Sequence, residues 1–184
     1  MVEFDDIYYI RLIRDGNTNA FVHIVRRYQR MVFSIVSKIV PNTEDAEDIT
    51  QEVFIKVFQS LDKFRGESGF STWLYRIAYN TTISETRKAK RIFPSLEEMI
   101  AYIPDEDISD DIGHIEKEER LKCLDTVLKK MDPADAMIIS LYYLNDYSVD
   151  DICKIVNLSQ SNVKIKLFRI RKFMNFEINK LISQ

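Results

Sequence analysis

The stretch Ser148–Lys172, SVDDICKIVNLSQSNVKIKLFRIRK, holds the most specific local pattern in the chain. Ser148 before two aspartates is typical of a capped helix start, and Asn157-Leu158 indicates a turn after a short helix that ends at Val156. Ser159 can cap the next helix. Apolar residues recur at a spacing that packs the two helices together, at Val149, Ile152, Val156, Leu158, Val163, Leu167 and Ile170. The stretch therefore predicts a helix-turn-helix.

The second of these helices is strongly basic. Residues 159–176 contain no acid and five cationic side chains, Lys164, Lys166, Arg169, Arg171 and Lys172. A helical hairpin without function could share the apolar pattern, but it would not need this separation of charge. The charge favours a DNA-binding recognition helix. Cys153 falls where the two helices approach, and we interpret it as a packing residue rather than a redox group.

Composition favours helices for the whole chain. Only 4 Gly and 4 Pro among 184 residues leave few tight turns, which indicates an all-α protein rather than a sandwich or barrel. Cys123 and Cys153 lack CxxC spacing, so they form neither a disulfide framework nor a four-ligand zinc site. No apolar run approaches the roughly 20 residues of a bilayer span, and the first 20 residues carry acids instead of a basic leader region. We expect a soluble, cytoplasmic protein without membrane insertion.

Charge is divided unevenly along the chain and indicates three parts. Residues 88–119 hold 4 basic and 10 acidic residues, whereas residues 120–184 hold 11 basic and 7 acidic residues. The acidic stretch also contains proline and glycine and lacks sustained helical periodicity. We therefore predict two small helical domains, residues 1–91 and 120–184, joined by a flexible acidic linker, residues 92–119. A flexible linker of about this length would span about 30 Å, so the domains could lie well apart on one partner.

The N-terminal part reads as a series of helices. We expect a first helix over residues 4–14, a second that closes before Pro41, a third capped by Asn42 or Thr43, and a fourth from near Phe70. The second helix carries a core-facing stripe formed by Phe21, Ile24, Val25, Tyr28, Val32, Ile35, Val36 and Ile39.

The third helix has an acidic surface without a basic residue between Ile39 and Ile55. Its acids are Glu44, Asp45, Glu47, Asp48 and Glu52. This surface could be a solvated helix face, or it could be a docking surface for a basic protein. A metal site is the weaker alternative, because carboxylates on one exposed helix lack a second element that converges on the ion.

The stretch Phe64–Arg91 interleaves aromatic and cationic side chains, the combination that single-stranded nucleic acid favours. Phe70 and Trp73 lie on the apolar stripe of the fourth helix and are better explained as core. The better candidates for stacking and polar contacts are Tyr75, Tyr79 and Asn80. The loop before this helix contains two glycines, which would let the backbone approach an unstacked base closely.

In these segments the chain resembles the extracytoplasmic-function sigma factors, the small two-domain sigma subunits of bacterial RNA polymerase. DAEDITQEVF at 45–54 is similar to the family's polymerase-binding helix, and FRG at 64–66 with FSTWLYRIAYN at 70–80 is similar to its promoter-melting segment. VDDI at 149–152 and the residues from Leu158 to Lys172 are similar to its helix-turn-helix for the upstream promoter element. Asn157 stands where glycine is usual, and Ile165 stands where a small polar residue is commoner.

The resemblance implies a sigma subunit that docks on core RNA polymerase, recognises two promoter elements in DNA and opens the downstream one. Its region 2 would be residues 1–91 and its region 4 residues 120–184, with the acidic linker in the polymerase cleft and RNA exit path. The implied polymerase contacts are Asp48, Gln51 and Glu52. The implied −10 contacts are Arg65, Ser68, Phe70, Arg76, Tyr79 and Asn80. The implied −35 contacts are Ser159, Gln160, Ser161, Asn162, Lys164, Lys166, Arg169, Arg171 and Lys172.

The resemblance also allows an anti-sigma factor as a partner, and it implies neither a cofactor nor catalysis by the chain itself. The sequence contains no GxxxxGK, GxGxxG or HExxH motif. Two other classes stay open at this point. One is an autonomous helix-turn-helix regulator that binds an operator without polymerase. The other is an enzyme acting on nucleic acid, with metal ligands at Asp105, Asp107, Asp110 and Asp111.

Overall fold

The structure, a computed structural model, describes residues 5–88, 96–101, 103 and 117–182. Within these ranges every regular element is a helix and no strand occurs, so the predicted all-α class is confirmed. Two 3-10 turns, Thr18–Ala20 and Leu61–Lys63, join described α-helices. The α-helices are α1 Asp6–Arg14, α2 Phe21–Ile39, α3 Thr43–Ser60, α4 Phe70–Lys88, α5 Leu96–Ile100, α6 Lys117–Lys130, α7 Pro133–Tyr143, α8 Val149–Val156 and α9 Gln160–Ile182.

Side-chain caps determine where several of these helices begin. Asn42 caps α3, Asp132 caps α7 ahead of the proline that starts it, and Ser148 caps α8, each by accepting a backbone N–H at 2.8–3.1 Å. At the end of α8, Asn157 adopts the left-handed conformation, with φ 56° and ψ 47°. Asparagine tolerates this conformation better than most residues with a side chain, so it can replace the usual glycine. These four predictions from the sequence are confirmed.

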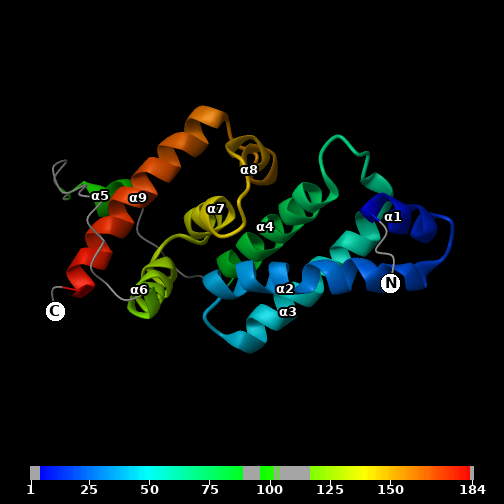
Figure 1. The fold of residues 1–184 in the computed structure, drawn as a ribbon, viewed down its shortest axis with the longest axis horizontal. Coiled ribbons are helices and arrows are strands. Elements are labelled where there is room, and N and C mark those ends of the chain that lie inside the picture. Colours follow the sequence, from blue (N-terminus) through cyan, green and yellow to red (C-terminus); the bar gives the residue numbers. More distant parts are fainter. Residues whose placement is uncertain (1–4, 89–95, 102, 104–116, 183–184) are drawn as a thin grey trace.

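The N-terminal half, α1 to α4, is built around α2 (Figure 1). The predicted stripe on α2 is in the core, with Ile24, Tyr28, Val32, Ile35, Val36 and Ile39 buried. α3 and α4 pack on this helix and on each other. The Arg14 guanidinium at the end of α1 donates to the carbonyl oxygens of Leu61 (2.8 Å) and Phe64 (2.5 Å), which ties α1 to the turn between α3 and α4.

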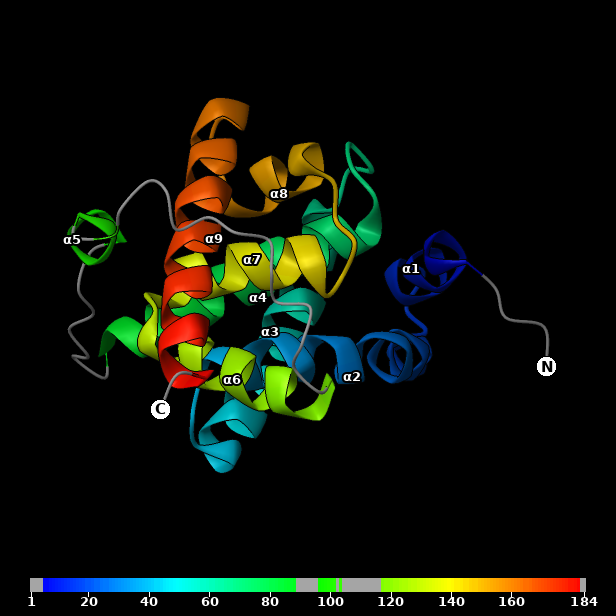
Figure 2. The ribbon, with the colours of Figure 1, turned by 60° about the vertical axis from the view of Figure 1, so that its left-hand side comes forward.

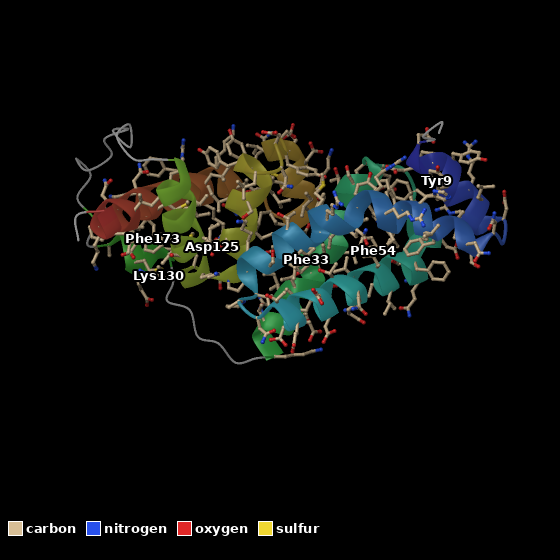
Figure 3. All side chains as sticks on the ribbon, turned by 60° about the horizontal axis from the view of Figure 1, so that its bottom comes forward. Tyr9, Phe33, Phe54, Asp125, Lys130 and Phe173 are labelled. Carbon is tan, nitrogen blue, oxygen red and sulfur yellow. The ribbon has the colours of Figure 1, made fainter. Side chains whose placement is uncertain are left out.

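The C-terminal half, α6 to α9, holds the predicted helix-turn-helix in α8 and α9. Figure 2 shows the long helix α9 standing beside α7, with α8 against its upper end. Val163, Leu167 and Ile170 of α9 are buried, as the apolar spacing predicted. An ion pair between Lys130 and Glu177 (2.8 Å) joins α6 to the far end of α9. Lys130 is labelled in Figure 3.

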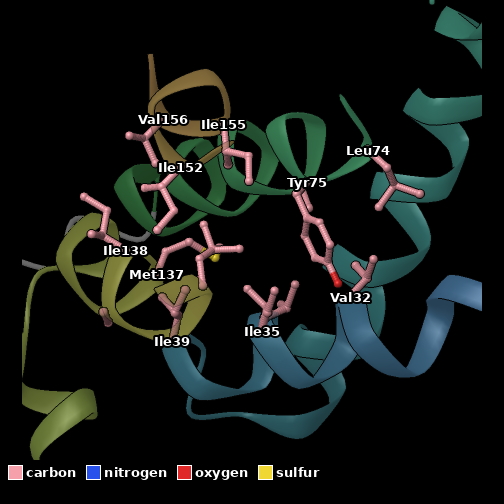
Figure 4. Close-up of a cluster of buried hydrophobic side chains, with 14 of the residues drawn as sticks. Val32, Ile35, Ile39, Leu74, Tyr75, Met137, Ile138, Ile152, Ile155 and Val156 are labelled. Carbon is pink, nitrogen blue, oxygen red and sulfur yellow. The ribbon is translucent and has the colours of Figure 1, made fainter. Parts of the chain in front are cut away.

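The two halves share one apolar core. Figure 4 shows Val32, Ile35 and Tyr75 facing Met137, Ile152 and Ile155 from the C-terminal half. α8 packs against α4, and α7 packs against α2 and α4. The rings of Tyr75 and Tyr147 lie 5.1 Å apart at 79°, and Lys38 pairs with Asp125 across the boundary at 3.9 Å. The expectation that the two domains lie well apart does not describe this conformation.

Helices occur in the described part of the predicted linker. α5 forms within it and packs against α9, with Leu96 buried, and α6 begins inside it at Lys117. α5 and the first residues of α6 therefore lie within the predicted linker. A helix of five residues has too few turns to produce a periodic pattern, and tertiary packing supplies its stability.

Candidate protein and nucleic-acid interfaces

The acidic surface of α3, here called the acidic face, is accessible along its length. It consists of Glu44, Asp45, Glu47, Asp48, Gln51 and Glu52, of which only Glu52 is partly buried. Glu52 pairs with Lys56 at 3.3 Å, one turn further along the helix. Four exposed carboxylates and one exposed amide therefore remain on this face, and together they form a negatively charged surface next to the α2–α3 turn.

The acidic face borders an open pocket of about 310 Å³ between the start of α3 and the end of α4. The pocket is lined by apolar and acidic side chains, from Val40, Pro41, Asp45, Asp48, Ile49, Glu85 and Thr86. Sequence reasoning missed Glu85 because it belongs to a different helix. Such a pocket suits the aliphatic stem and charged head of a lysine or arginine from another protein.

The loop that precedes α4 forms a second pocket of about 470 Å³, here called the loop pocket. Its lining combines cationic, polar and aromatic side chains, from Asp62, Lys63, Phe64, Arg65, Gly66, Glu67, Ser68, Trp73 and Arg76. Gly66 has φ +77°, a conformation that favours glycine, and so allows the tight turn. The rings of Phe64 and Trp73 lie 5.4 Å apart. An aromatic wall beside the exposed Arg65 and Arg76 matches the chemistry of an unstacked base and its phosphates.

A groove of about 570 Å³ runs between α3 and α4 and continues the loop pocket, since Lys63 lines both. Its other lining residues are Lys56, Gln59, Ser60, Ile77, Asn80, Thr81 and Ser84. Asn80 was predicted from the sequence, whereas Lys56, Gln59 and Lys63 were missed. The spacing of these three residues puts them on one side of the chain, a signal that could have identified them. We call this surface the α3–α4 groove.

The helix-turn-helix is held together by polar contacts as well as by its core. The Ser159 hydroxyl accepts the backbone N–H of Asn162 (3.3 Å), which confirms it as the cap of α9. The Gln160 amide donates to Asp150 of α8, and the Ser161 hydroxyl lies 3.1 Å from that of Ser159. Cys153 packs against the apolar core, as predicted. The first turn of α9 is therefore fixed relative to α8.

The predicted −35 residues of α9 fall into two groups. Ser159, Gln160, Ser161, Asn162, Lys164 and Arg171 are exposed. The other cations have partners or are covered: Lys166 pairs with Asp135 of α7 at 2.6 Å, and Arg169 pairs with Glu97 of α5. Lys172 is only 8% exposed. The structure thus keeps the N-terminal turns of the helix open and occupies part of its C-terminal turns.

Comparisons with known proteins agree with this arrangement along most of the chain. The family model of sigma-70 region 2 matches residues 24–92, and that of sigma-70 region 4 matches residues 121–174. The ECF RNA polymerase sigma-E factor of Escherichia coli (strain K12) is 32% identical over 184 residues, covering 95% of each chain. The chain belongs to the ECF subfamily of sigma-70 factors.

Two solved structures have the same fold as this sigma factor. CnrH, solved in complex with the cytosolic domain of CnrY, has a TM-score of 0.65 with 21% identity and covers 97% of both chains. The sigma factor RpoE of Bartonella quintana, solved with the anti-sigma factor NepR, has a TM-score of 0.62 with 17% identity, over 86% of this chain and 96% of that one.

In this sigma factor, α4 is covered on two sides, which changes the role of several predicted residues. Phe70 is 4% exposed and packs with Phe64 and Trp73, so its side chain is part of the core. Tyr75 is 1% exposed, and the prediction that it offers a stacking surface is wrong for this conformation. Burial raises the pKa of the Tyr79 hydroxyl, and the nearby carboxylates at the start of α7 raise it further. Tyr79 is thus partly buried against the core near the start of α7.

The sequence predicts Lys172 as a −35 contact because it belongs to the basic run of α9. It is buried, and α5 packs on α9 with Glu97 paired to Arg169 less than one turn away. The residue pattern of one helix does not show which of its side chains are buried by another segment of the chain. The prediction of an exposed Lys172 is therefore wrong in this conformation, for a tertiary reason.

Asp135 and Lys166 form a pair whose loss should be measurable. Replacing Lys166 with methionine should lower the free energy of unfolding by about 2 kcal/mol at neutral pH, because it leaves the buried Asp135 carboxylate without its cation. Burial raises the pKa of Asp135, and Lys166 opposes that rise. Without Lys166 the pKa rises further, so the lost stability should return as the pH falls and the carboxyl is protonated. Urea denaturation at neutral and acid pH measures both effects.

The double variant Lys166→Met/Asp135→Asn tests the cause of that loss, because it removes both charges together. It should recover most of the stability. Arg171→Met is the matched control, since Arg171 is an exposed cation on the same helix. Equal losses in the single and double variants would contradict a stranded carboxylate as the cause.

Two further predictions concern membranes and metals. Across the described ranges, no helix combines the length and apolar character that a membrane span requires. Asp105, Asp107, Asp110 and Asp111, the imagined metal ligands of a nucleic-acid enzyme, lie outside the described residues. In the part of the chain that is described, no three His, Cys, Asp or Glu side chains are grouped so that they could hold a metal ion.

Proposed function

We propose that this sigma factor binds core RNA polymerase through the acidic face of α3 and directs it to promoters through two DNA-binding surfaces. The observation that carries the proposal is the order of these surfaces in the chain. The acidic face, the loop pocket and the α3–α4 groove lie within the region 2 match, and the helix-turn-helix lies within the region 4 match. This order corresponds to docking, opening of the downstream element and recognition of the upstream element.

For polymerase binding we propose Asp48, Gln51 and Glu52, together with Glu85. A basic surface on the polymerase would complement the exposed carboxylates, and an aliphatic stem would fill the pocket beside them. A docking surface for a basic protein requires such carboxylates, whereas a solvated helix face does not.

For the −10 element we propose that the non-template strand enters the loop pocket and follows the α3–α4 groove. Arg65, Arg76 and Lys63 would contact phosphates, and Ser68 and Asn80 would contact an unstacked base. The backbone turn at Gly66 brings the loop close to that base. Tyr79 would join these contacts once α7 moves away from it, and Phe70 would support the pocket from the core.

For the −35 element we propose that α9 enters the major groove with its N-terminal turns. Gln160, Ser161, Asn162 and Lys164 would reach base edges, and Arg171 would bind the phosphate backbone. Ser159 caps the helix and orients its first N–H groups. Lys166 is assigned a structural role through Asp135, and Arg169 would bind phosphate after release from Glu97.

The remaining assignments follow from these surfaces. We propose region 2 at residues 1–91, a connecting segment at residues 92–119 and region 4 at residues 120–184. The polymerase supplies the chemistry of RNA synthesis, so this sigma factor acts as a non-catalytic specificity subunit in the cytoplasm. An anti-sigma factor is a further proposed partner, since the structurally similar RpoE of Bartonella quintana was solved with one.

Run-off transcription on genomic fragments tests the proposal. Core polymerase with this chain should start transcripts at specific sites, and core polymerase alone should not. An autonomous regulator would instead bind DNA without polymerase and support no transcription. A nucleic-acid enzyme would instead degrade or alter the fragments in a metal-dependent reaction.

Asn80→Ala should reduce open-complex formation about tenfold, because it removes a contact that exists only with an unstacked base. Closed-complex formation should stay within about twofold of wild type, since the base is still paired at that stage. Permanganate reactivity of promoter thymines measures opening, and filter binding at low temperature measures the closed complex. Asn19→Ala is the matched control, because Asn19 is exposed at the far end of the N-terminal half. Permanganate reactivity equal to wild type would remove Asn80 from the strand contacts.

A further inference from the structure

The recognition helix exposes two large apolar side chains. Phe168 is 52% exposed and Ile165 is 48% exposed, although both lie in the middle of a helix whose opposite side is core. They share one face with Ser161, four residues before Ile165. Large apolar side chains exposed next to each other in this way indicate an interaction surface rather than incomplete packing.

The surroundings of Ile165 indicate what that surface meets. The exposed polar side chains around it are those of Ser161, Asn162 and Lys164, and Arg171 is exposed six residues further on. A partner that fits this surface carries negative charges and hydrogen-bonding groups around one apolar group. Duplex DNA has this composition in the major groove, where phosphates border the base edges.

Isoleucine has neither a donor nor an acceptor, so it cannot read the polar edge of any base. The one apolar group in the major groove is the C5-methyl of thymine. Opposite another base, Ile165 would take the place of water around polar edge atoms and leave them without partners, which costs affinity.

The backbone around Ile165 is fixed before binding. Val163 and Leu167 on either side are buried, Lys166 is paired with Asp135, and Gln160 is tied to α8. These contacts direct Ile165 away from the core. Its β-branched side chain also has few rotamers to lose, so little conformational entropy opposes the contact.

We propose that Ile165 is a specificity-determining residue that selects thymine at one position of the upstream promoter element by contact with its C5-methyl group. Phe168, on the same face, covers one side of that contact. The proposal rests on the function proposed above, because it assumes that α9 reads the upstream element. It goes further by naming the base and the atom that the residue recognises.

The test compares thymine with deoxyuridine, which differs only by the missing methyl group. Holoenzyme first selects binding sites from promoter fragments randomised in the upstream element, and each thymine of the selected element, on both strands, is then replaced singly by deoxyuridine. At one position the replacement should weaken wild-type binding about fourfold, the effect expected for burying one carbon group. Ile165→Ser holoenzyme should bind the two fragments equally at that position.

Two variants serve as controls. Ile165→Val keeps a branched apolar side chain and should keep most of the preference for thymine over deoxyuridine. Val22→Ser makes a matched change at another exposed apolar residue, on α2, and should keep the full wild-type preference.

Two results would overturn the assignment. One is that no thymine on either strand is sensitive to loss of its methyl group. The other is an equal penalty for deoxyuridine in wild type and Ile165→Ser. If the wild-type holoenzyme selects a specific upstream element but shows either result, this inference fails while the proposed function stands. If the holoenzyme selects no specific sequence, the proposed function fails with it.

Discussion

Asp48→Lys combined with Glu52→Lys should weaken binding to core RNA polymerase about 100-fold, because the reversed charges would repel the basic surface that the acidic face is proposed to meet. The fold should persist. Asp48 is exposed, and the pair of Glu52 with Lys56 is half-exposed, so its loss costs less than about 1 kcal/mol. Titration of core polymerase with fluorescently labelled protein measures the affinity, and circular dichroism measures the helix content.

A matched charge reversal separates local from general electrostatics. Asp15→Lys changes an exposed carboxylate at the end of α1, far from the start of α3 in Figure 1, and it should leave the affinity nearly unchanged. The wild-type affinity should also fall as salt is raised, and that of the double variant should depend on salt less or in the opposite sense. Unchanged affinity of the double variant at moderate salt would exclude α3 as the docking site.

Ile152→Ala should lower the free energy of unfolding by about 3 kcal/mol, the usual cost of removing a fully buried isoleucine side chain beyond its β-carbon. Ile152 is 0% exposed and belongs to α8, which packs on α4 of the other half (Figure 4). Because the halves share a core, the loss should appear in a single transition. Urea denaturation followed by circular dichroism and by tryptophan fluorescence measures it.

The single tryptophan makes this measurement specific to one half. Trp73 lies in the N-terminal half, so its fluorescence reports α4 and its neighbours although the substitution is in α8. Both signals should shift to the same lower urea concentration. Lys154→Ala changes an exposed position on α8. The free energy of unfolding from either signal should then change by no more than about 0.5 kcal/mol. An unchanged tryptophan midpoint beside a biphasic circular dichroism curve would mean that the halves unfold independently.

Elements with one apolar face and clear caps could be predicted from the sequence. The stripe on α2, the Asp132 and Ser148 caps and the left-handed Asn157 all depend on residues within a few positions of one another. The structure has each of them where the sequence indicated. Local features of this kind can be predicted without tertiary structure, because helical spacing alone decides which side chains share a face.

The contacts that the sequence could not reveal join distant segments. Tyr75 lies on the polar side of α4 by helical spacing, yet it is buried because a second layer of helices covers that side. The partners of Lys166 and Arg169 lie 31 and 72 residues away, so no short-range rule pairs them. Lys172 belongs to the basic run of α9 but is buried, and α5 packs on this helix from a distant part of the sequence.

The candidate interfaces show the same difference between features of one stretch of sequence and features that join distant segments. The acidic face and the first turns of α9 were predicted because each is a single run of sequence. Glu85 lines the pocket beside the acidic face, and Lys56 lines the α3–α4 groove, only because two helices come together. Surfaces formed between elements need the packing before their members can be named.

The closed arrangement of the two halves lowers the apparent affinity of the chain alone for DNA. Tyr79 is partly buried on α4, against which α7 packs, and Arg169 is engaged by Glu97, so a promoter contact with either residue competes with an existing interaction. Conformational selection then reduces apparent affinity in proportion to the open fraction: if about one chain in a hundred is open, the apparent Kd is about a hundredfold above the intrinsic value. A partner that holds the halves apart removes that factor for the −10 contact, and release of α5 from α9 removes it for Arg169. The same linkage means that promoter DNA, by favouring the open form, strengthens the binding of such a partner to the same degree.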